Sequence, residues 1–421
     1  MTETRGIRRS RRLLHRCIAA AFGAAFLTGF AGAGEWTQFR GPAGQGVSPE
    51  SQAPTRWSQS ANLLWTAELP GPGSSSPIVA GNRVFVTCYS GDANDATRRL
   101  VCLDPRTGKV AWVRDVPGKL PEQAGIREGH GYASSTPAAD GERVYAFFGK
   151  SGVFAFDHLG NQLWQADVGS RTSGWGSAAS PVLAGDLVVV NASVESESLV
   201  ALDRRTGKEV WRAGGIRESW NTPILVSVGD RTELAVAVFG KVLGFDPRTG
   251  QQLWECTTGI SWYMVPSLAA DRDVVYCTGG RQGAALAVRA GGRGDVTQSH
   301  RLWTARKGSN VTSPVFCEGH LYWANENLGI AYCANAKTGE MVYEERLGGA
   351  GQIYASPVVA GGHLYYLTRS GRMYVLAAQP KFQQVAVNDL DDRSRFNASP
   401  AVADGRLFVR SDKYLYCIGA R

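Results

Sequence analysis

The chain has few charged residues and no motif that names a catalytic or metal site. Only 19% of its 421 residues are Asp, Glu, Lys or Arg, and only six are histidine. Its cysteines form neither a Cys-x-x-Cys nor a Cys-x-x-Cys-His pattern, and no two are adjacent, so the common zinc and covalent-haem spacings are absent. Neither a Gly-x-Ser-x-Gly elbow nor a Walker-type loop occurs. We therefore assign no catalytic residue and no metal ligand from the sequence.

Apolar runs long enough to cross a membrane are also absent. The run from Ile18 to Phe30 follows six arginines and precedes Ala31-Gly32-Ala33, and it is shorter than the roughly 20 residues that a spanning helix needs. This order is typical of a cleaved export signal. We expect residues 1–33 to be that signal, with no transmembrane span after cleavage and the remainder in the periplasm or cell envelope. SRRLLHR (10–16) resembles a twin-arginine signal except at His15, so the Sec and twin-arginine routes both stay open.

Excess positive charge is confined to that leader. Residues 1–33 hold six of the 45 cations and one of the 37 acids, which leaves 39 cations and 36 acids, a net charge of +3. No nucleic-acid partner is therefore expected.

Seven cysteines remain after the leader is removed, and because the number is odd at least one stays unpaired within the chain. Buried thiols and a Cys88–Cys102 bridge across one hairpin both stay open.

Glycine and tryptophan, by contrast, are plentiful, with 51 and 12 residues, which favours many short strands and tight turns. A small residue and a proline precede an apolar strand eight times, at spacings of 60, 44, 42, 43, 48, 43 and 43 residues. The prolines are Pro77, Pro137, Pro181, Pro223, Pro266, Pro314, Pro357 and Pro400. Such a period predicts a repeat architecture.

The repeats share a plan of two strands, a variable loop, and two further strands joined by an Asp-x-x-Thr-Gly hairpin, as in LVALDRRTGKEVW (199–211). The fifth and seventh repeats are irregular, because residues 289–303 and 377–390 replace the usual turn. Four antiparallel strands in about 43 residues are typical of a propeller blade. We predict an all-β, eight-bladed propeller over residues 62–421. The last repeat lacks a fourth strand, so the segment 62–69 is expected to close the ring. Residues 34–61 would form an arm, and the protein would be a monomer.

The hairpin residues have structural explanations. Asp203 is expected to accept backbone N–H bonds, and Gly207 to adopt a positive φ in a bulged turn. The tryptophans at the hairpin's end are expected to wedge neighbouring blades together, with each indole N–H bonded to the backbone. They are Trp112, Trp164, Trp211 and Trp254, with Tyr343 in the same place.

These repeats resemble the PQQ-like (quinoprotein alcohol dehydrogenase-like) β-propeller superfamily, which includes quinoprotein dehydrogenases and the assembly factor BamB. The motif A-x-D-x-x-T-G-x-x-x-W carries the resemblance, here as Ala201, Asp203, Thr206, Gly207 and Trp211. The resemblance implies the fold more strongly than an activity, since the superfamily contains enzymes and scaffolds. The vicinal disulfide of the enzymes is missing here, and so is a recognisable calcium site. The lipidation cysteine of BamB is missing as well.

Loops on one face of the ring hold the candidate binding residues. Cations and aromatic side chains there could hold a flat anionic ligand such as PQQ, or the aromatics could simply plug the channel. The candidate cofactor-binding residues are Trp175, Trp220, Trp262, Lys150, Lys241, Arg281, Arg369 and Lys413.

We interpret the chain as an exported, non-catalytic binding or assembly scaffold of the BamB kind. It would bind another protein or a small anionic ligand at this loop face. The alternative is a PQQ-dependent oxidoreductase, a quinoprotein dehydrogenase with a divergent site in the central funnel. The sequence leaves the cofactor undetermined.

Overall fold

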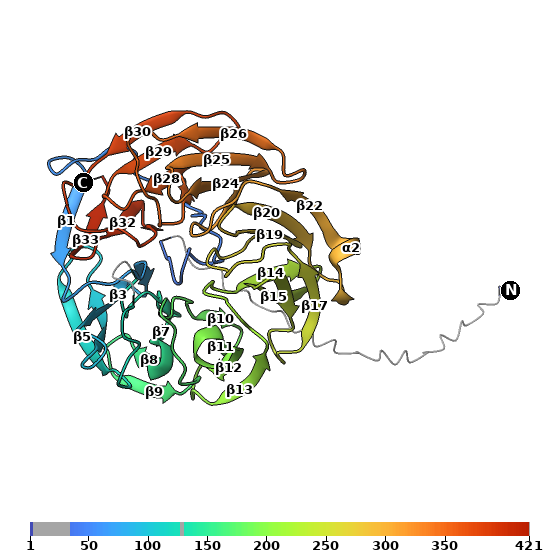
Figure 1. Ribbon diagram of the computed structural model, residues 1–421, viewed down its shortest axis with the longest axis horizontal. Coiled ribbons are helices and arrows are strands. Elements are labelled where there is room, and N and C mark those ends of the chain that lie inside the picture. Colours follow the sequence, from blue (N-terminus) through green and yellow to red (C-terminus); the bar gives the residue numbers. More distant parts are fainter. Residues whose placement is uncertain (3–33, 127–129, 421) are drawn as a thin grey trace. The chain divides into compact units, whose positions relative to one another are not determined.

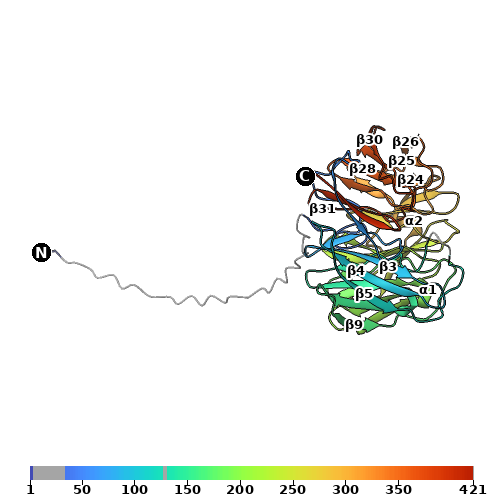
Figure 2. The same cartoon turned by 90° about the vertical axis from the view of Figure 1, so that its left-hand side faces the viewer.

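Residues 1–2, 34–126 and 130–420 are described in the computed structural model. Eight antiparallel sheets form a ring around a central axis (Figure 1), which confirms the predicted eight-bladed propeller. Seen from the side, β3, β4 and β5 of one blade lie one beside the next (Figure 2). The predicted export signal, residues 1–33, lies outside the described residues apart from its first two.

The strands of each blade run from the axis outwards in chain order. The first four blades are β2(Ile78–Ala80), β3(Arg83–Ser90), β4(Thr97–Leu103), β5(Val110–Pro117); β6(Ala138–Ala139), β7(Arg143–Phe147), β8(Val153–Asp157), β9(Gln162–Ala166); β10(Val182–Ala184), β11(Leu187–Ala192), β12(Ser198–Asp203), β13(Glu209–Gly214); and β14(Ile224–Val228), β15(Arg231–Val238), β16(Lys241–Phe245), β17(Gln252–Thr257).

The second half of the ring repeats this order, with one strand taken from the start of the chain. The blades are β18(Ala269–Asp271), β19(Val274–Gly279), β20(Ala284–Arg289), β22(Arg301–Ala305); β23(Val315–Cys317), β24(His320–Asn325), β25(Ile330–Asn335), β26(Met341–Arg346); β27(Val358–Ala360), β28(His363–Leu367), β29(Met373–Ala377), β30(Gln384–Asn388); and β31(Ala401–Ala403), β32(Arg406–Arg410), β33(Tyr414–Ile418), β1(Leu63–Glu68).

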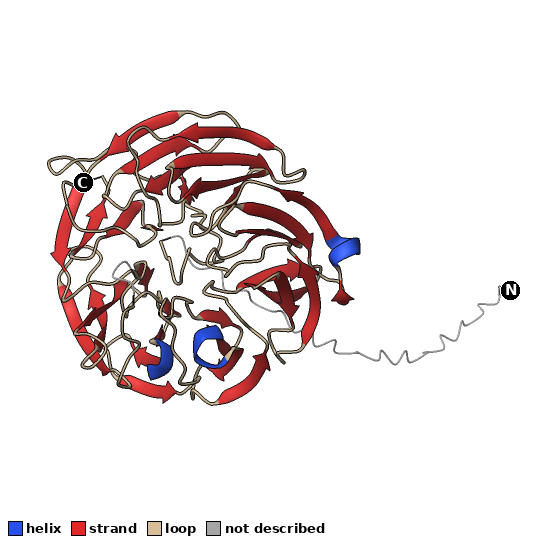
Figure 3. Ribbon diagram, in the orientation of Figure 1, coloured by secondary structure: helices blue, strands red, loops and turns tan. Residues whose placement is uncertain are grey.

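Within residues 34–126 and 130–420, helix is confined to three short turns (Figure 3): the 3₁₀ turn Gly149–Ser151, α1(Ser193–Ser196) and α2(Thr297–His300). In the part of the chain that the structure describes, no helix has the length and apolar character to cross a membrane.

The first strand completes the last blade, as predicted. β1 pairs antiparallel with β33, from Leu63 opposite Ile418 to Glu68 opposite Tyr414. Both β1 and β33 would otherwise expose an unpaired edge. The closure therefore pairs β1 with β33 and gives the eighth blade its fourth strand.

Tryptophans join each blade to the next. Gly207 has φ +73°, and a Cβ there would lie 2.7 Å from the Trp164 ring, so the turn requires glycine. Asp203 accepts the N–H groups of Arg205 and Thr206 at 3.2 and 2.8 Å, which confirms its role in the turn. Three predicted wedge tryptophans donate to a backbone carbonyl of the next blade at 3.0 Å: Trp112 to His158, Trp164 to Arg204 and Trp211 to Pro247.

Trp254 departs from this rule, because the next blade lacks the Asp-x-x-Thr-Gly turn. Its indole N–H donates to Glu233 Oε2 at 2.7 Å. Glu233 is fully buried and also accepts from Gly291 N and Arg231 Nε, at 3.1 Å each. A short fifth strand, β21(Gly294–Asp295), pairs in parallel with β17 over Trp254 and Glu255. The side-chain carboxylate thus replaces the missing turn carbonyl.

The arm, residues 34–61, runs along innermost strands at the centre of the ring, where it is blue in Figure 1. Trp36 bridges Val79 of β2, and Val47 bridges Val359 of β27. Arg40 is 1% exposed and reaches the axis. Its guanidinium donates to the carbonyl oxygens of Leu268 (3.2 Å), Gln45 (3.0 Å) and Pro314. Burial lowers the pKa of Arg40 to about 9.

All seven cysteines of the described region are free. The open Cys88–Cys102 bridge is excluded by strand register, because Cys88 lies opposite Arg99 and Cys102 opposite Phe85. Of the two alternatives, free thiols and a Cys88–Cys102 disulfide, the structure supports free thiols.

Candidate functional site

The central channel widens into a cavity of about 790 Å³ on the face where each chain segment enters its inner strand. This volume falls within the range of ligand pockets. Phe39 of the arm is part of the lining. Because Arg40 binds the carbonyls next to Ser267 and Ser313 of the lining, the arm closes the base of the cavity.

Eight hydroxyl groups, one from each blade, encircle this cavity in a closed ring of hydrogen bonds. In every case the backbone N–H of one ring residue donates to the side-chain oxygen of the next, at 2.9–3.0 Å. In order the residues are Ser76, Thr136, Ser180, Thr222, Ser267, Ser313, Ser356 and Ser399, and Ser399 donates back to Ser76. We call this set the hydroxyl ring.

In the sequence these residues mark the repeat, and their role in the hydroxyl ring was not predicted. Seven of them directly precede the repeat's proline, whereas Ser267 follows Pro266. A residue before proline is held in an extended conformation, which suits a cross-blade bond. The recurrence of Ser or Thr at that place was the signal that could have revealed the ring.

Aromatic side chains form one wall of the cavity. Tyr263 lies among three tryptophans, with ring centroids 5.5 Å from Trp175, 5.7 Å from Trp220 and 5.1 Å from Trp262. Trp220 is fixed by a 2.7 Å bond from its N–H to Gly176 O. The wall is therefore a packed cluster rather than a set of separate rings.

Two arginines stand over aromatic rings at the cavity. Arg281 lies 5.6 Å from the centroid of Trp262, and Arg369 lies 4.3 Å from that of Tyr354. Arg369 is held further by Asn397 Oδ1 at 3.0 Å and Gln352 Oε1 at 2.8 Å. Such stacking leaves the outer edge of a guanidinium able to bind an anion.

Two buried polar atoms of the lining have no hydrogen-bond partner among the described residues, namely Trp262 Nε1 and Asn310 Oδ1. Glu326, the carboxylate of the described lining, is already engaged. It accepts from Ser309 Oγ (3.0 Å), Asn310 N (3.2 Å) and Asn327 Nδ2 (3.3 Å). A buried donor or acceptor that lacks a protein partner calls for water or a ligand.

The structure brings five of the eight predicted site residues to this cavity: Trp175, Trp220, Trp262, Arg281 and Arg369. Lys150, Lys241 and Lys413 do not line it. Lys150 donates to Pro121 O, and Lys241 forms a 2.7 Å ion pair with Glu255 of β17. Lys413 is exposed in the β32–β33 turn, where its carbonyl accepts from Leu69 N. Lys150 instead belongs to the lining of a second cavity.

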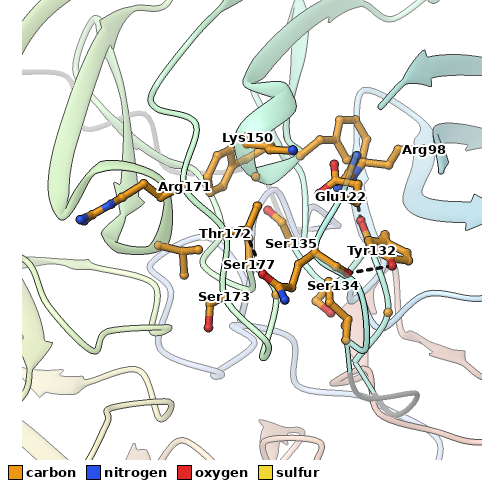
Figure 4. A pocket seen from close by; sticks show the side chains of 18 residues that line it. Arg98, Glu122, Tyr132, Ser134, Ser135, Lys150, Arg171, Thr172, Ser173 and Ser177 are labelled. Carbon is orange, nitrogen blue, oxygen red and sulfur yellow. Dashed lines mark hydrogen bonds and ion pairs between the residues drawn. The ribbon is translucent and has the colours of Figure 1, made fainter. Parts of the chain in front are cut away.

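A second, water-sized cavity of about 20 Å³ lies between the first three blades (Figure 4). Arg98 and Glu122 lie side by side there and form a 2.6 Å ion pair, with side chains 5% and 4% exposed. Ser177, also in the lining, donates to the carboxyl of the buried Glu195. Burial raises the pKa of Glu195 to about 7, although the hydrogen bond from Ser177 opposes this shift. Burial also lowers the pKa of His130, to about 4.

Glu195 should make stability depend on pH. Its pKa is about 4.5 when exposed and about 7 in the folded chain, so the folded state holds the extra proton and stability falls as the pH rises through this interval. We expect Glu195→Gln to become more stable relative to the parent by about 2 kcal/mol between pH 5 and 7.5. Urea unfolding of both proteins checks this. The His130 contribution is shared and cancels, and a constant difference would contradict the shift.

Comparison with known proteins places the chain in one family. The family model described as outer membrane protein assembly factor BamB matches residues 58–233, 181–345 and 238–380. The BamB of Nitrosomonas eutropha is 26% identical over 273 residues, which is 63% of this chain and 59% of that protein. The chain thus spans less than two thirds of the length of that relative.

Solved structures share the fold at low identity. BamB from Moraxella catarrhalis superposes with a TM-score of 0.60 and 16% identity, over 85% of this chain and 97% of the other. Quinohemoprotein alcohol dehydrogenase from Comamonas testosteroni superposes with a TM-score of 0.66 and 12% identity, over 92% of this chain and 81% of the other. The family match confirms the resemblance to PQQ-like propellers, and these structures share the fold.

Proposed function

Because the chain belongs to the family described as outer membrane protein assembly factor BamB, we propose that it is an exported, non-catalytic scaffold that binds a partner at the mouth of its central cavity. It would act in the periplasm or cell envelope, after removal of residues 1–33. The observation that supports this most is the cavity itself. Its base is closed by the protein's own arm, and its open end carries aromatic side chains and arginines that have no ion-pair partner among the described residues.

The quinone-dependent alternative is favoured by the fold of the alcohol dehydrogenase neighbour. The residues of this chain fit a PQQ–calcium site poorly. No two cysteines are adjacent, no cluster of three or more His, Cys, Asp or Glu occurs among the described residues, and Glu326 is held by three hydrogen bonds. We therefore derive no redox step for this cavity.

A photo-crosslinking experiment tests the scaffold. A benzophenone amino acid in place of Phe239, 50% exposed in the β15–β16 turn at the mouth, is expected to give discrete crosslinks to another envelope protein in cells. The matched control replaces Leu159, which is 69% exposed in the β8–β9 turn at the opposite end. Leu159 should give none of these products.

Two outcomes would overturn the proposal. Identical products from both positions, or none from either, would show that the mouth is no specific contact surface. Dye reduction by the purified protein with PQQ, Ca²⁺ and an alcohol would establish the oxidoreductase instead.

A further inference from the structure

Unused hydrogen-bond donors line the central cavity. Each of the eight hydroxyls of the ring accepts one backbone N–H, and none gives its proton to a described residue. Trp262 adds an unpartnered indole N–H, and Asn310 Oδ1 is an unpartnered acceptor. These donors require water or a ligand as their acceptor. A ligand that displaces the water has to supply acceptor oxygens of its own.

The rim beyond the cavity is basic on one side. Arg281 and Arg369 line the cavity, while Arg306 follows β22 and Arg346 ends β26. The alternating strand directions put all four on the mouth face. None of the four forms an ion pair with a carboxylate of the described region. We call these four residues the arginine rim.

Two carboxylates of this sector are already engaged, while Glu345, next to Arg346, is exposed. Glu344 pairs with Lys307 at 3.0 Å, and Glu326 accepts three hydrogen bonds. Exposed acidic residues of the mouth face also include Asp92 and Asp95 after β3, Glu218 before β14 and Asp391 before β31. The four arginines therefore form a local cationic sector, which favours the approach of an anionic ligand.

Apolar side chains lie along the arginine rim. Phe239 is 50% exposed in the β15–β16 turn and Leu328 is 49% exposed in the β24–β25 turn. The backbone carbonyl of Leu328 accepts from Arg346 at 2.8 Å, so the apolar and cationic groups adjoin. A small anion within the cavity would leave these groups unused, whereas an extended chain leaving the cavity would contact them.

We propose that the cavity and the arginine rim bind an acidic peptide segment bearing an aromatic side chain, supplied by a partner protein. This rests on the scaffold function proposed above. The aromatic side chain packs against Trp262 and Tyr263, where ring pairs are favourable. Carboxylates meet Arg281 and Arg369 in charge-assisted hydrogen bonds, and further acceptor oxygens meet the hydroxyl ring. The rest of the segment crosses the rim between Phe239 and Leu328.

Calorimetric titration with short synthetic peptides tests this. The acidic probe is an acetylated, amidated peptide of sequence DEFDE, and the matched probe is KKFKK. We expect DEFDE to bind at least about tenfold more tightly than KKFKK, with an affinity that falls as salt is added. The double variant Arg281→Gln plus Arg369→Gln should weaken DEFDE binding by about tenfold or more. The control, Arg106→Gln plus Arg205→Gln, changes exposed arginines in hairpins at the opposite end and should leave binding unchanged.

The outcomes separate the two proposals. Equal binding of both peptides, or full affinity in the Arg281/Arg369 variant, would overturn the acidic-segment proposal. So would binding of benzene-1,3,5-tricarboxylate without binding of DEFDE, which would identify a small-anion site. None of these results would affect crosslinking at position 239, so the scaffold function would stand or fall on its own experiment.

Discussion

Replacing Arg40 with methionine is expected to lower the free energy of unfolding by about 3–6 kcal/mol. The buried guanidinium donates to the carbonyls of Leu268, Gln45 and Pro314, which belong to three separate parts of the chain. Methionine keeps much of the volume but none of the donors, and each buried carbonyl left without a partner costs about 1–3 kcal/mol. Urea denaturation followed by tryptophan fluorescence measures the change.

A second arginine of the same arm provides the control. Arg56 is exposed and donates one hydrogen bond, to Val385 O at 2.9 Å. Arg56→Met should change the free energy of unfolding by less than about 1 kcal/mol, because water replaces the lost donor. If the two substitutions cost the same, Arg40 would not be the anchor that attaches the arm to the ring.

Trp254→Phe is expected to cost about 3–5 kcal/mol, more than the same change at Trp211. Loss of the indole N–H leaves Glu233 Oε2, buried and fully enclosed, with Gly291 N as its remaining close donor. Hydrogen bonds to a charged group contribute about 1.5–3 kcal/mol, and the smaller ring leaves unfilled space besides. Thermal and urea unfolding measure the loss.

Trp211→Phe should lower the free energy of unfolding by only about 1–2 kcal/mol. The acceptor that loses its hydrogen bond there is the carbonyl oxygen of Pro247, which is neutral. A double-mutant cycle with Glu233→Gln isolates the pair. We expect Trp254→Phe to cost less in the Glu233→Gln background than in the parent, because the amide carries no charge. Additive effects would mean that Trp254 contributes only through packing.

Much of the fold could be predicted because it repeats. The eight prolines and the Asp-x-x-Thr-Gly turns recur at nearly fixed spacing, and the ends of the chain are complementary, so blade number and closure by β1 followed from counting. Trp254 shows where repetition fails. Its turn partner is missing from the next blade, and the replacement, Glu233, lies on a strand of the same blade where no motif marks it.

The candidate site was harder to predict, because it depends on how far each loop reaches inward. Strand direction puts Lys241 and Arg281 on the same face, yet Arg281 lines the cavity while Lys241 binds Glu255. Arg281 lies within the β19–β20 turn, whereas Lys241 is the first residue of β16, and the sequence alone did not separate them. The hydroxyl ring was missed for a different reason, since a small residue before proline has an adequate explanation in backbone conformation alone.

Closure of the ring by β1 also sets an order of events during synthesis. Leu63 is made long before Ile418, yet the two pair. Until β33 has been made, β1 has no neighbour, and the eighth blade cannot assemble. Blades in the middle contact their sequence neighbours and can form as they emerge, whereas the final contact spans nearly the whole chain and requires closure of a very long loop. A nascent chain therefore holds β1 as an unpaired strand until β33 has emerged to pair with it.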